Sequence, residues 1–402
     1  MATAAIVSIA GGGLAASATA AEAGVEGIAK PTTGTPAIGA TATSNAWPAY
    51  RAFVDKFVSP EGRVIDFSTA VQQTTSEGQS YGLFFALVAN DRAAFDRLLN
   101  WTANNLTQAH FAPGDLRLPS WQWGRKKDGS FGVLDTNSAS DSDIWIAYDL
   151  LQAGRLWSEP KYTKLGMALA EEAAKREVVN VEGLGPMLIP GPQGFQKDGV
   201  TRLNPSYLPL PVLRGLAQAL PNGPWSALAD NGLAMVKAIA PHGFSPDWAA
   251  WKGGQFIADP ESKDTGSYDA IRTYLWAGMA SPRDPLANPW LDALGGMRKA
   301  VADTGMAPER ATVSTGAVSG QGPLSYWGAL APYFKALGDT KGLWLARAKL
   351  AVLDAPAATD PHTPNAPVYY DWVLGLFGSG FADGRFAFDE RGNLAPNWAA
   401  RH

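Results

Sequence analysis

The 402-residue sequence contains no cysteine, which excludes disulfide bonds and thiolate metal sites. Histidine is almost as scarce, and no two of the histidines have the spacing of metal ligands, so a zinc site is not expected. The histidines are His110, His242, His362 and His402. The sequence therefore predicts neither a metal nor a cofactor.

Charge of one sign and long apolar segments are also lacking. The formal net charge is −4, and no basic patch occurs that would favour binding to nucleic acid. Beyond the N-terminal residues no segment is apolar for long enough to span a membrane, so an integral membrane protein is not expected. In contrast, the sequence has 15 Trp and 11 Tyr, which suit a large core or a groove for flat sugar rings.

The N-terminal residues differ in composition from the rest of the chain. Residues 1–23 are small and apolar and resemble the hydrophobic region and cleavage site of a secretory signal, without its positively charged start. A low-complexity tail is the alternative. Residues 24–45 are rich in Thr, Gly, Ala and Pro and predict a linker. Residues 46–402 contain no second linker and predict a single domain. The signal-like segment predicts that the protein is periplasmic or secreted.

Helical periodicity dominates this domain and predicts twelve helices. The even-numbered helices are apolar all round, whereas the odd-numbered ones carry charged residues on one side, so inner and outer helices alternate. This pattern predicts an all-α ring of six helical hairpins, with short strands in connections such as Gly129–Asp135. The predicted helices are Trp47–Val58, Glu77–Ala89, Arg92–Leu106, Ser140–Trp157, Pro160–Arg176, Pro205–Ala219, Trp225–Ile239, Ser267–Met279, Pro285–Ala302, Pro323–Leu337, Lys341–Leu353 and Pro367–Phe377.

Glu77 opens the second predicted helix, in the segment SEGQSYG. Ser76 would cap this helix, and an acidic residue in the first turn complements the helix dipole. That explanation leaves Gly78 and Gly82 unexplained, because each costs roughly 1 kcal/mol of helix stability relative to Ala. We therefore expect another group to approach this helix closely.

Two further acidic clusters open inner helices. Asp141 and Asp143 lie in NSASDSDIWIAY, where Asn137, Ser138 and Ser140 already supply helix caps, so two more carboxylates exceed the need. An Asp-x-Asp pair could hold a hard cation, but this one lacks the Gly and the distal Glu of a calcium loop. Asp269 lies in GSYDAIRTYLW, three residues before Arg272 and next to Tyr268. It is either an ordinary first-turn acid with a helical partner or a functional carboxylate kept ionised by the arginine.

If all inner helices run in the same direction, Glu77, Asp141 and Asp269 meet at one face. Hydrolysis of a glycosidic bond needs one protonated and one ionised carboxyl group, and a third could orient the sugar. Aromatic residues accompany these clusters. Trp121 and Trp123 lie in a connection, where sugar stacking is favoured over burial. Tyr326 and Tyr370 begin the tenth and twelfth helices, Trp248 and Trp251 lie in SPDWAAWKGG, and Trp145 and Trp276 are expected in the core.

The segments TSEGQSYGLFFALVANDRAAFDRLLNWT, LDTNSASDSDIWIAYDLLQAGRLW and GSYDAIRTYLWAGM resemble glycoside hydrolase family 8, especially the endoglucanases encoded with bacterial cellulose synthase. The resemblance implies an (α/α)6 barrel and inversion at the anomeric carbon. It implies that Glu77 is the proton donor, that Asp269 is the general base and that Asp141 binds and distorts the sugar. Tyr268 and Arg272 would hold the base and its water.

The expected substrate is a β-1,4-glucan bound across the helix N-termini, with possible association with a cellulose synthase complex. An inverting mechanism requires the two carboxyl groups to lie about 6.5–9.5 Å apart. Burial and nearby acids should raise the pKa of Glu77, whereas Arg272 should keep Asp269 charged. Two residues depart from the family pattern, Ser142 and Asp149, and little effect is expected from either.

Other functions remain open. A xylanase, a chitosanase or a mixed-linkage glucanase would belong to the same family. A glucan-binding accessory protein without turnover is an alternative of another class. A polysaccharide lyase on a similar ring is less favoured, because such enzymes usually recruit Tyr, His or Arg as base and the histidines lie outside the acidic motifs.

Overall fold

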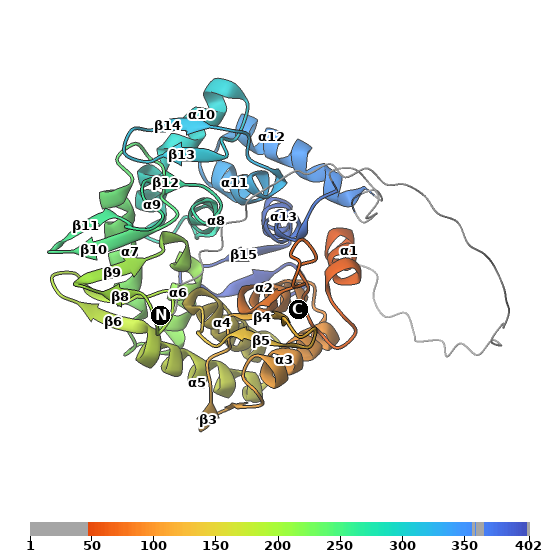
Figure 1. Cartoon of the computed structure of the whole chain (residues 1–402). Helices are drawn as coiled ribbons and strands as arrows, with labels where there is room; N and C mark the ends of the chain where they lie inside the picture. Colours follow the sequence, from red (N-terminus) through yellow and green to blue (C-terminus); the bar gives the residue numbers. More distant parts are fainter. Residues whose placement is uncertain (1–46, 356–357, 359–365, 400–402) are drawn as a thin grey trace. The chain divides into compact units, whose positions relative to one another are not determined.

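A computed structural model describes residues 47–355, 358 and 366–399. The predicted signal-like segment and linker, residues 1–23 and 24–45, lie outside the described residues. The described part contains thirteen α-helices, two 3-10 helices and sixteen short strands (Figure 1). None of the described helices combines the length and hydrophobicity needed to cross a bilayer.

Six helices form an inner ring in which each packs against the next along the chain (Figure 1). Contact between the rings of Phe85 and Phe377, 4.8 Å apart, closes this ring. The inner helices are α2 (Ser76–Val88), α4 (Ser140–Leu156), α6 (Leu210–Ala219), α8 (Ile271–Met279), α11 (Leu324–Ala336) and α13 (Tyr369–Ala382).

An outer layer of helices packs against the inner ring, one against each inner helix. The predicted alternation is confirmed, and the fold is an (α/α)6 barrel. The remaining helices are α1 (Pro48–Phe57), α3 (Arg92–Asn105), α5 (Pro160–Glu177), α7 (Trp225–Ile239), α9 (Ala287–Ala293), α10 (Gly295–Thr304), α12 (Thr340–Leu350), η1 (Pro205–Tyr207) and η2 (Ala351–Asp354).

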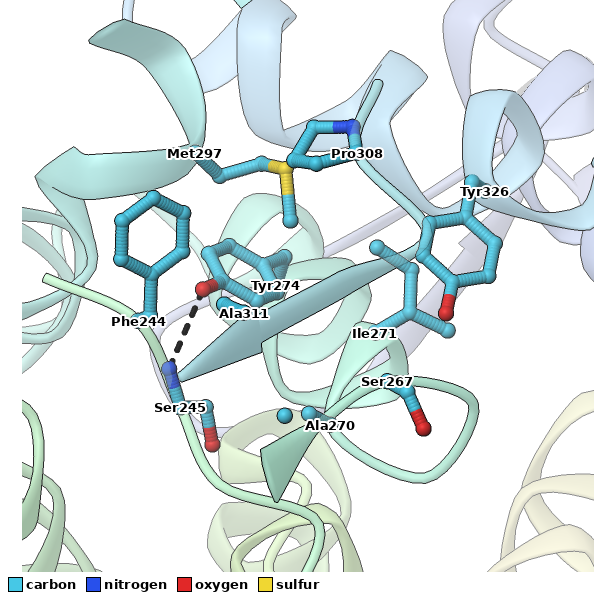
Figure 2. Close-up of a pocket in the computed structure, with 11 residues that line it drawn as sticks. Phe244, Ser245, Ser267, Ala270, Ile271, Tyr274, Met297, Pro308, Ala311 and Tyr326 are labelled. Carbon is cyan, nitrogen blue, oxygen red and sulfur yellow. Dashed lines mark hydrogen bonds between the residues drawn. The ribbon is translucent and has the colours of Figure 1, made fainter. Parts of the chain in front are cut away.

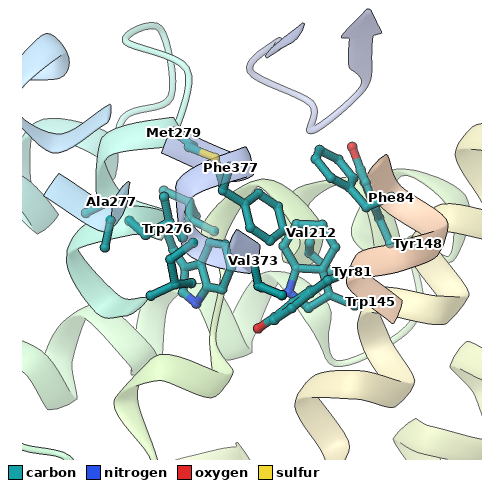
Figure 3. Close-up of a cluster of buried hydrophobic side chains, with 14 of the residues drawn as sticks. Tyr81, Phe84, Trp145, Tyr148, Val212, Trp276, Ala277, Met279, Val373 and Phe377 are labelled. Carbon is teal, nitrogen blue, oxygen red and sulfur yellow. The ribbon is translucent and has the colours of Figure 1, made fainter. Parts of the chain in front are cut away.

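Aromatic side chains fill the interior of the ring (Figure 3). The ring of Phe377 lies 5.1 Å from Tyr81, 5.7 Å from Trp145 and 5.4 Å from Trp276, so three other inner helices meet it. Trp145 and Trp276 are buried, which confirms their predicted place in the core. A helix that contacts neighbours on every side must be apolar all round, and this explains the pattern of the even-numbered segments.

The end of the ring at the C-termini of the inner helices is covered by a hairpin of β15 (Phe386–Phe388) and β16 (Leu394–Pro396). Phe84 of α2 packs against Phe386 and Phe388, with ring centroids 5.1 and 6.2 Å away. Tyr148 of α4 donates a 2.6 Å hydrogen bond to the carbonyl of Gly392, between the two strands. The hairpin therefore seals the far end of the aromatic core.

The other strands are short and lie in the connections between helices. One of them, β5, lies within Gly129–Asp135, where a strand was predicted. They form three antiparallel sheets, β1-β4-β5, β11-β10-β9-β8 and β12-β13-β14, and two hairpins, β2-β3 and β6-β7. Their bounds are β1 Thr74–Thr75, β2 Phe111–Ala112, β3 Asp115–Leu116, β4 Gln122–Arg125, β5 Phe131–Asp135, β6 Val178–Val181, β7 Gly185–Leu188, β8 Gln196–Lys197, β9 Val200–Leu203, β10 Ala249–Lys252, β11 Gln255–Ala258, β12 Thr265–Gly266, β13 Arg310–Thr312 and β14 Ala317–Ser319.

Two predicted helices are each divided into two elements. The sixth, Pro205–Ala219, is a 3-10 turn followed by α6, because Pro209 lacks the amide hydrogen that a continuous helix would need. The ninth, Pro285–Ala302, is divided into α9 and α10 at Leu294. There the amide of Gly296 donates to the carbonyl of Gly243, 3.0 Å away, instead of to its own helix.

Candidate active site

Glu77 lies in the first turn of α2, at the N-terminal end of the inner ring. The capping residue is Thr75 and not Ser76, as predicted, because the Thr75 hydroxyl accepts a 3.0 Å hydrogen bond from the amide of Gly78. A Cβ atom on Gly78 would lie 2.5 Å from the hydroxyl of Tyr369. The expected close approach is therefore confirmed at Gly78, where α13 meets α2.

Asp141 occupies the first turn of α4 and is almost fully buried, with 3% exposure. Its Oδ1 accepts hydrogen bonds from the amide and the hydroxyl of Ser142, at 2.7 and 3.2 Å. The serine that departs from the family pattern thus donates to the carboxylate beside it, a contact that Ala or Gly could make only through the backbone.

Asp269 lies in a turn just before α8, and not inside the predicted helix Ser267–Met279. The carboxylate of Asp247 holds this turn: its Oδ1 accepts from the amides of Ser267, Asp269 and Ala270, at 2.7, 3.1 and 2.8 Å. Sequence reasoning missed Asp247, although it lies in the segment SPDWAAWKGG, beside a tryptophan that had been noted for its ring.

One guanidinium joins two of the predicted acids. Arg272 Nη1 donates to Glu77 Oε2 at 2.7 Å, and its Nη2 donates to Asp269 Oδ1 at 3.2 Å. The same Nη2 lies 3.1 Å from the hydroxyl of Ser206, and the arginine is 5% exposed. The predicted contact between Arg272 and Asp269 is confirmed, and Glu77 is a second partner that the sequence did not indicate.

Burial dominates the titration of these acids. It raises the pKa of Glu77 to about 7, with the Asp141 charge acting in the same direction and Arg272 against it. Burial also raises the pKa of Asp269 to about 6, although Arg272 and the indole of Trp248 both favour its charged form. The pKa of Asp141 is raised by burial as well. Arg272 thus stabilises the Asp269 carboxylate as predicted, but burial outweighs it.

The Trp248 indole is a further contact that sequence reasoning missed. Its Nε1 donates to Asp269 Oδ2 at 2.9 Å, so both carboxylate oxygens of Asp269 are held. The ring stacks on Phe195, with centroids 5.8 Å apart, and lies under the Arg202 guanidinium at 4.9 Å. The sequence indicates only the aromatic face of Trp248, whereas the structure shows that its indole N–H contacts Asp269.

The three predicted tyrosines are brought together beside Asp269. Tyr370 donates a 2.7 Å hydrogen bond to the carbonyl of Tyr268, and the Tyr268 hydroxyl lies 3.3 Å from Glu309 Oε1. Tyr268 therefore does not hydrogen-bond Asp269, as its position had suggested. Tyr326 is 1% exposed, packs edge-on against Tyr268 and donates to the Glu309 carbonyl, so it presents no face to a sugar.

Trp121 and Trp123 are half-buried in the connection before α4. The Trp121 carbonyl accepts from the amide of Ser76, which ties this connection to the start of α2. The Trp123 ring stacks on Phe131, with centroids 5.4 Å apart, and lies 4.3 Å from the Arg63 guanidinium. These neighbours would compete with a sugar for the Trp123 ring.

A small cavity lies behind the turn that carries Asp269 (Figure 2). Its volume is about 10 Å³, which is room for no more than one water molecule. Its wall includes Tyr274, whose hydroxyl accepts from the Ser245 amide at 3.1 Å. This cavity is too small for a sugar. Across the described residues, no three His, Asp or Glu side chains are grouped so as to hold a metal ion.

The family model for "Glycosyl hydrolases family 8" matches residues 29–384 of this chain. The chain belongs to glycosyl hydrolase family 8. It is a glycoside hydrolase. Among its relatives, an endoglucanase of Xanthomonas axonopodis pv. citri (strain 306) is 45% identical over 362 residues, which is 90% of this chain and 92% of the relative. An endoglucanase of Escherichia coli (strain K12) is 43% identical over 355 residues, 88% and 91% of the two chains.

Solved structures support the same assignment of this family 8 hydrolase. An endo-1,4-D-glucanase from Vibrio fischeri ES114 superposes with a TM-score of 0.81 at 38% identity, covering 88% of this chain and 99% of that one. An endo-β-1,4-glucanase from Acetobacter xylinum gives a TM-score of 0.65 at 26% identity, covering 83% and 96%. The (α/α)6 barrel is thus shared with family members of known structure.

Behind the acids of this family 8 hydrolase lies a second pair of carboxyl groups. Asp143 and Glu177 are both fully buried, and the pKa of Asp143 is raised first by burial and then by the neighbouring Glu177. Ser138 donates to Glu177 Oε1 at 2.6 Å, but among the described residues no N–H or hydroxyl group donates to Asp143. Two buried carboxyl groups this close together repel each other when both are ionised, so at least one of them keeps its proton. The sequence suggests only a helix cap or a metal ligand for Asp143, and it gives no sign of Glu177 as a neighbour.

This pair should make the stability of the family 8 hydrolase fall with rising pH. Burial raises the pKa of Glu177 to about 8 and that of Asp143 well above its usual value. Folding thus takes up protons: the stabilisation is complete below about pH 4, the pKa range of unfolded carboxyls, and is lost as the pH rises through about 8. We expect Glu177→Gln to reduce the fall in Tm between pH 5 and pH 8.5, as measured by thermal unfolding.

The matched control is Glu171→Gln, on the exposed side of the same helix, which should keep the wild-type slope. If both variants lose Tm with pH as steeply as the wild type does, the buried pair does not hold the extra proton.

Proposed function

We propose that this family 8 hydrolase is an endo-β-1,4-glucanase that cleaves internal bonds of cellulose-type chains with inversion of the anomeric carbon. The observation that carries the proposal is the Arg272 guanidinium, which contacts Glu77 at 2.7 Å and Asp269 at 3.2 Å. Two carboxyl groups from distant parts of the chain are thereby held beside each other, as hydrolysis of a glycosidic bond requires. The names of the relatives support the β-1,4-glucan substrate.

In the proposed reaction, Glu77 gives its proton to the glycosidic oxygen while the bond from that oxygen to the anomeric carbon breaks. A water molecule attacks the anomeric carbon from the opposite face, and Asp269 takes the proton that this water releases. Arg272 and Trp248 orient the Asp269 carboxylate for this role. Asp141 binds and distorts the sugar at the cleavage point.

The contacts with Arg272 set an upper limit on the separation of the two carboxyl groups, and this limit allows inversion. Glu77 Oε2 and Asp269 Oδ1 contact different terminal nitrogens of the Arg272 guanidinium. The distance between these two oxygens therefore cannot exceed the sum of the two contact distances and the distance between the two nitrogens. In inverting hydrolases the two carboxyl groups lie about 6.5–9.5 Å apart, which leaves room for the attacking water. The limit set by Arg272 is compatible with this range.

The order of the pKa values supports the assigned roles. An acid must be protonated and a base ionised at the working pH, so the acid needs the higher pKa of the two. The pKa of Glu77 is raised to about 7 and that of Asp269 to about 6. Between these values a substantial fraction of the enzyme carries a protonated Glu77 and an ionised Asp269.

The substrate would lie across the N-terminal ends of the inner helices. Tyr268, Tyr370, Trp121 and Trp123 are the aromatic residues proposed to contact it, with Tyr326 supporting Tyr268 from behind. From the resemblance to endoglucanases encoded with cellulose synthase, we propose a periplasmic or secreted enzyme that acts on glucan in association with a cellulose synthase complex.

The stereochemistry of the first product tests the mechanism. Proton NMR of a cellopentaose digest should detect the α-anomer first, because attack by water opposite the leaving group inverts the β-linkage. The viscosity of carboxymethylcellulose should fall steeply while few reducing ends form, as internal cleavage requires. Early appearance of the β-anomer would contradict the assignment of Asp269 as a base that activates water.

Parallel digests separate the alternatives. Faster release of reducing sugar from xylan, chitosan or mixed-linkage β-glucan than from carboxymethylcellulose would assign one of those substrates instead. Binding of all four polymers without any product would indicate an accessory protein that has lost turnover.

A further inference from the structure

A groove of about 760 Å³ lies at the tips of three hairpins, β6-β7, β8-β9 and β10-β11. This volume is within the usual range for ligand sites, about 300–1,000 Å³. The groove combines one aromatic ring with polar side chains. The residues that matter for its chemistry are Asn180, Glu182, Lys197, Asp198, Thr201 and Trp251.

Trp251 is half-buried and fixed in place. Its indole Nε1 donates to the carbonyl of Glu182 at 3.0 Å, which joins strand β10 to the β6-β7 turn. Its ring packs against Phe256 on the paired strand in a T-shaped arrangement, with centroids 4.7 Å apart. A ring held by a hydrogen bond and a packed neighbour can bind a flat apolar surface without losing much conformational freedom.

The groove and the catalytic centre lie on opposite faces of the sheet β11-β10-β9-β8. Ala250 pairs with Arg202, whose guanidinium covers Trp248, and Trp248 in turn contacts Asp269. Trp251 pairs with Thr201, one position along both strands. Because successive side chains in a strand point to opposite faces, Trp251 points away from the face that carries Arg202 and Trp248. The groove is therefore a separate site and does not extend the catalytic centre.

The polar side chains of the groove are available to a ligand. Within the described part of the chain, no ion pair or hydrogen bond engages the side chains of Asn180, Glu182, Lys197 or Asp198. Both signs of charge are present, so neither a polyanion nor a polycation would be favoured. An added Cβ on Gly199, in the β8-β9 turn, would meet nothing within 4 Å, so the turn is open.

We infer that this groove is a second β-glucan-binding site, which holds the polymer on the enzyme while the catalytic centre cleaves another part of it. β-Glucan is a neutral chain of flat sugar rings that carry hydroxyl groups. The fixed indole can stack on one ring, and the surrounding polar side chains can hydrogen-bond its hydroxyl groups. The inference rests on the proposed β-glucan substrate, but not on the roles of the catalytic acids.

The test compares long and short substrates. In the Glu77→Gln background, Trp251→Ala should weaken binding to hydroxyethylcellulose about tenfold in affinity electrophoresis, with the gel lacking polymer as reference. In the otherwise wild-type enzyme, the same substitution should raise KM for hydroxyethylcellulose several-fold, while kcat/KM for cellotetraose stays unchanged because this short chain occupies only the catalytic centre.

Two further variants keep the test decisive if Trp251→Ala disturbs folding. The double variant Lys197→Ala/Asp198→Ala changes only exposed residues at the tip of the β8-β9 hairpin and should also weaken polymer binding. Trp344→Ala removes a 67% exposed tryptophan from α12 and should change neither polymer binding nor KM.

The outcomes separate the two proposals. If the wild type cleaves carboxymethylcellulose but the groove variants bind hydroxyethylcellulose as tightly as the parent does, the second site is refuted. An equal loss of kcat/KM on cellotetraose and on polymer would also refute it, since the groove would then serve the catalytic centre. If the wild type binds and cleaves no β-1,4-glucan, the proposed function itself fails.

Discussion

Replacing Glu77 by Gln is expected to lower kcat on carboxymethylcellulose by about 10²–10⁴-fold, the usual contribution of general acid catalysis. The substitution keeps the shape of the side chain and an oxygen for the 2.7 Å contact with Arg272, but removes the proton that the leaving oxygen needs. The loss should shrink greatly for a 2,4-dinitrophenyl cello-oligosaccharide, since this leaving group departs without protonation. Initial rates on both substrates provide the measurement.

Ionisation of Glu77 should also set the alkaline limb of the wild-type pH profile on carboxymethylcellulose, and this limb should be weak or absent on the activated substrate, whose leaving group needs no proton. The pKa of Glu77 is raised to about 7, so the wild-type rate should decline above that pH as the proton is lost. Glu171→Gln, on the exposed surface of α5, is the control that should retain wild-type activity. Equal losses on the natural and activated substrates would show that Glu77 does not protonate the leaving group.

Replacing Asp269 by Asn should lower kcat by a similar factor, about 10²–10⁴, on both kinds of substrate. Attack by water is needed whichever group leaves, so an activated leaving group cannot compensate for a missing base. The amide of the variant keeps an oxygen that can accept from the Trp248 indole, which lies 2.9 Å from Asp269 Oδ2 in the wild type. The Asp247 contacts that hold the turn involve backbone amides, so the substitution leaves them in place. Single-turnover rates and the circular dichroism of the folded variant together measure the effect.

Azide gives this prediction a positive readout. A small anion that needs no deprotonation can attack in place of water, so azide should accelerate Asp269→Asn and give a glycosyl azide of α-configuration. It should not accelerate Glu77→Gln on carboxymethylcellulose, where the leaving oxygen still lacks its proton. If Asp269→Asn keeps near-normal activity and Asp141→Asn abolishes it, the base is Asp141.

The ring of helices could be predicted from the sequence because its cause is local. A segment such as α4 is apolar on every side, and this pattern predicts a buried helix whichever helices surround it. The core positions of Trp145 and Trp276 follow from the same pattern. Gly78 carried a further local signal, since a glycine in a helix indicates a close neighbour even when that neighbour, Tyr369, is far away in the chain.

The details of the site depended on contacts between distant segments. The start of α8 was predicted too early because the sequence does not show the role of Asp247. Its carboxylate, 20 residues before Ser267, accepts hydrogen bonds from the amides with which the helix was predicted to begin. Arg272 offered only its neighbour Asp269 as a partner in the sequence, whereas Glu77 lies on another helix. Likewise, the chain gives no local sign that Asp143 would meet Glu177.

The filled interior of the ring limits how a polymer can reach this enzyme. Phe377 and its neighbours occupy the axis, and the hairpin β15-β16 closes the far end, so no chain can thread through. A glucan must instead be laid down sideways, with both of its ends extending into solvent. Entry then requires no free terminus, and a segment in the middle of a long strand is as easily captured as one near its tip.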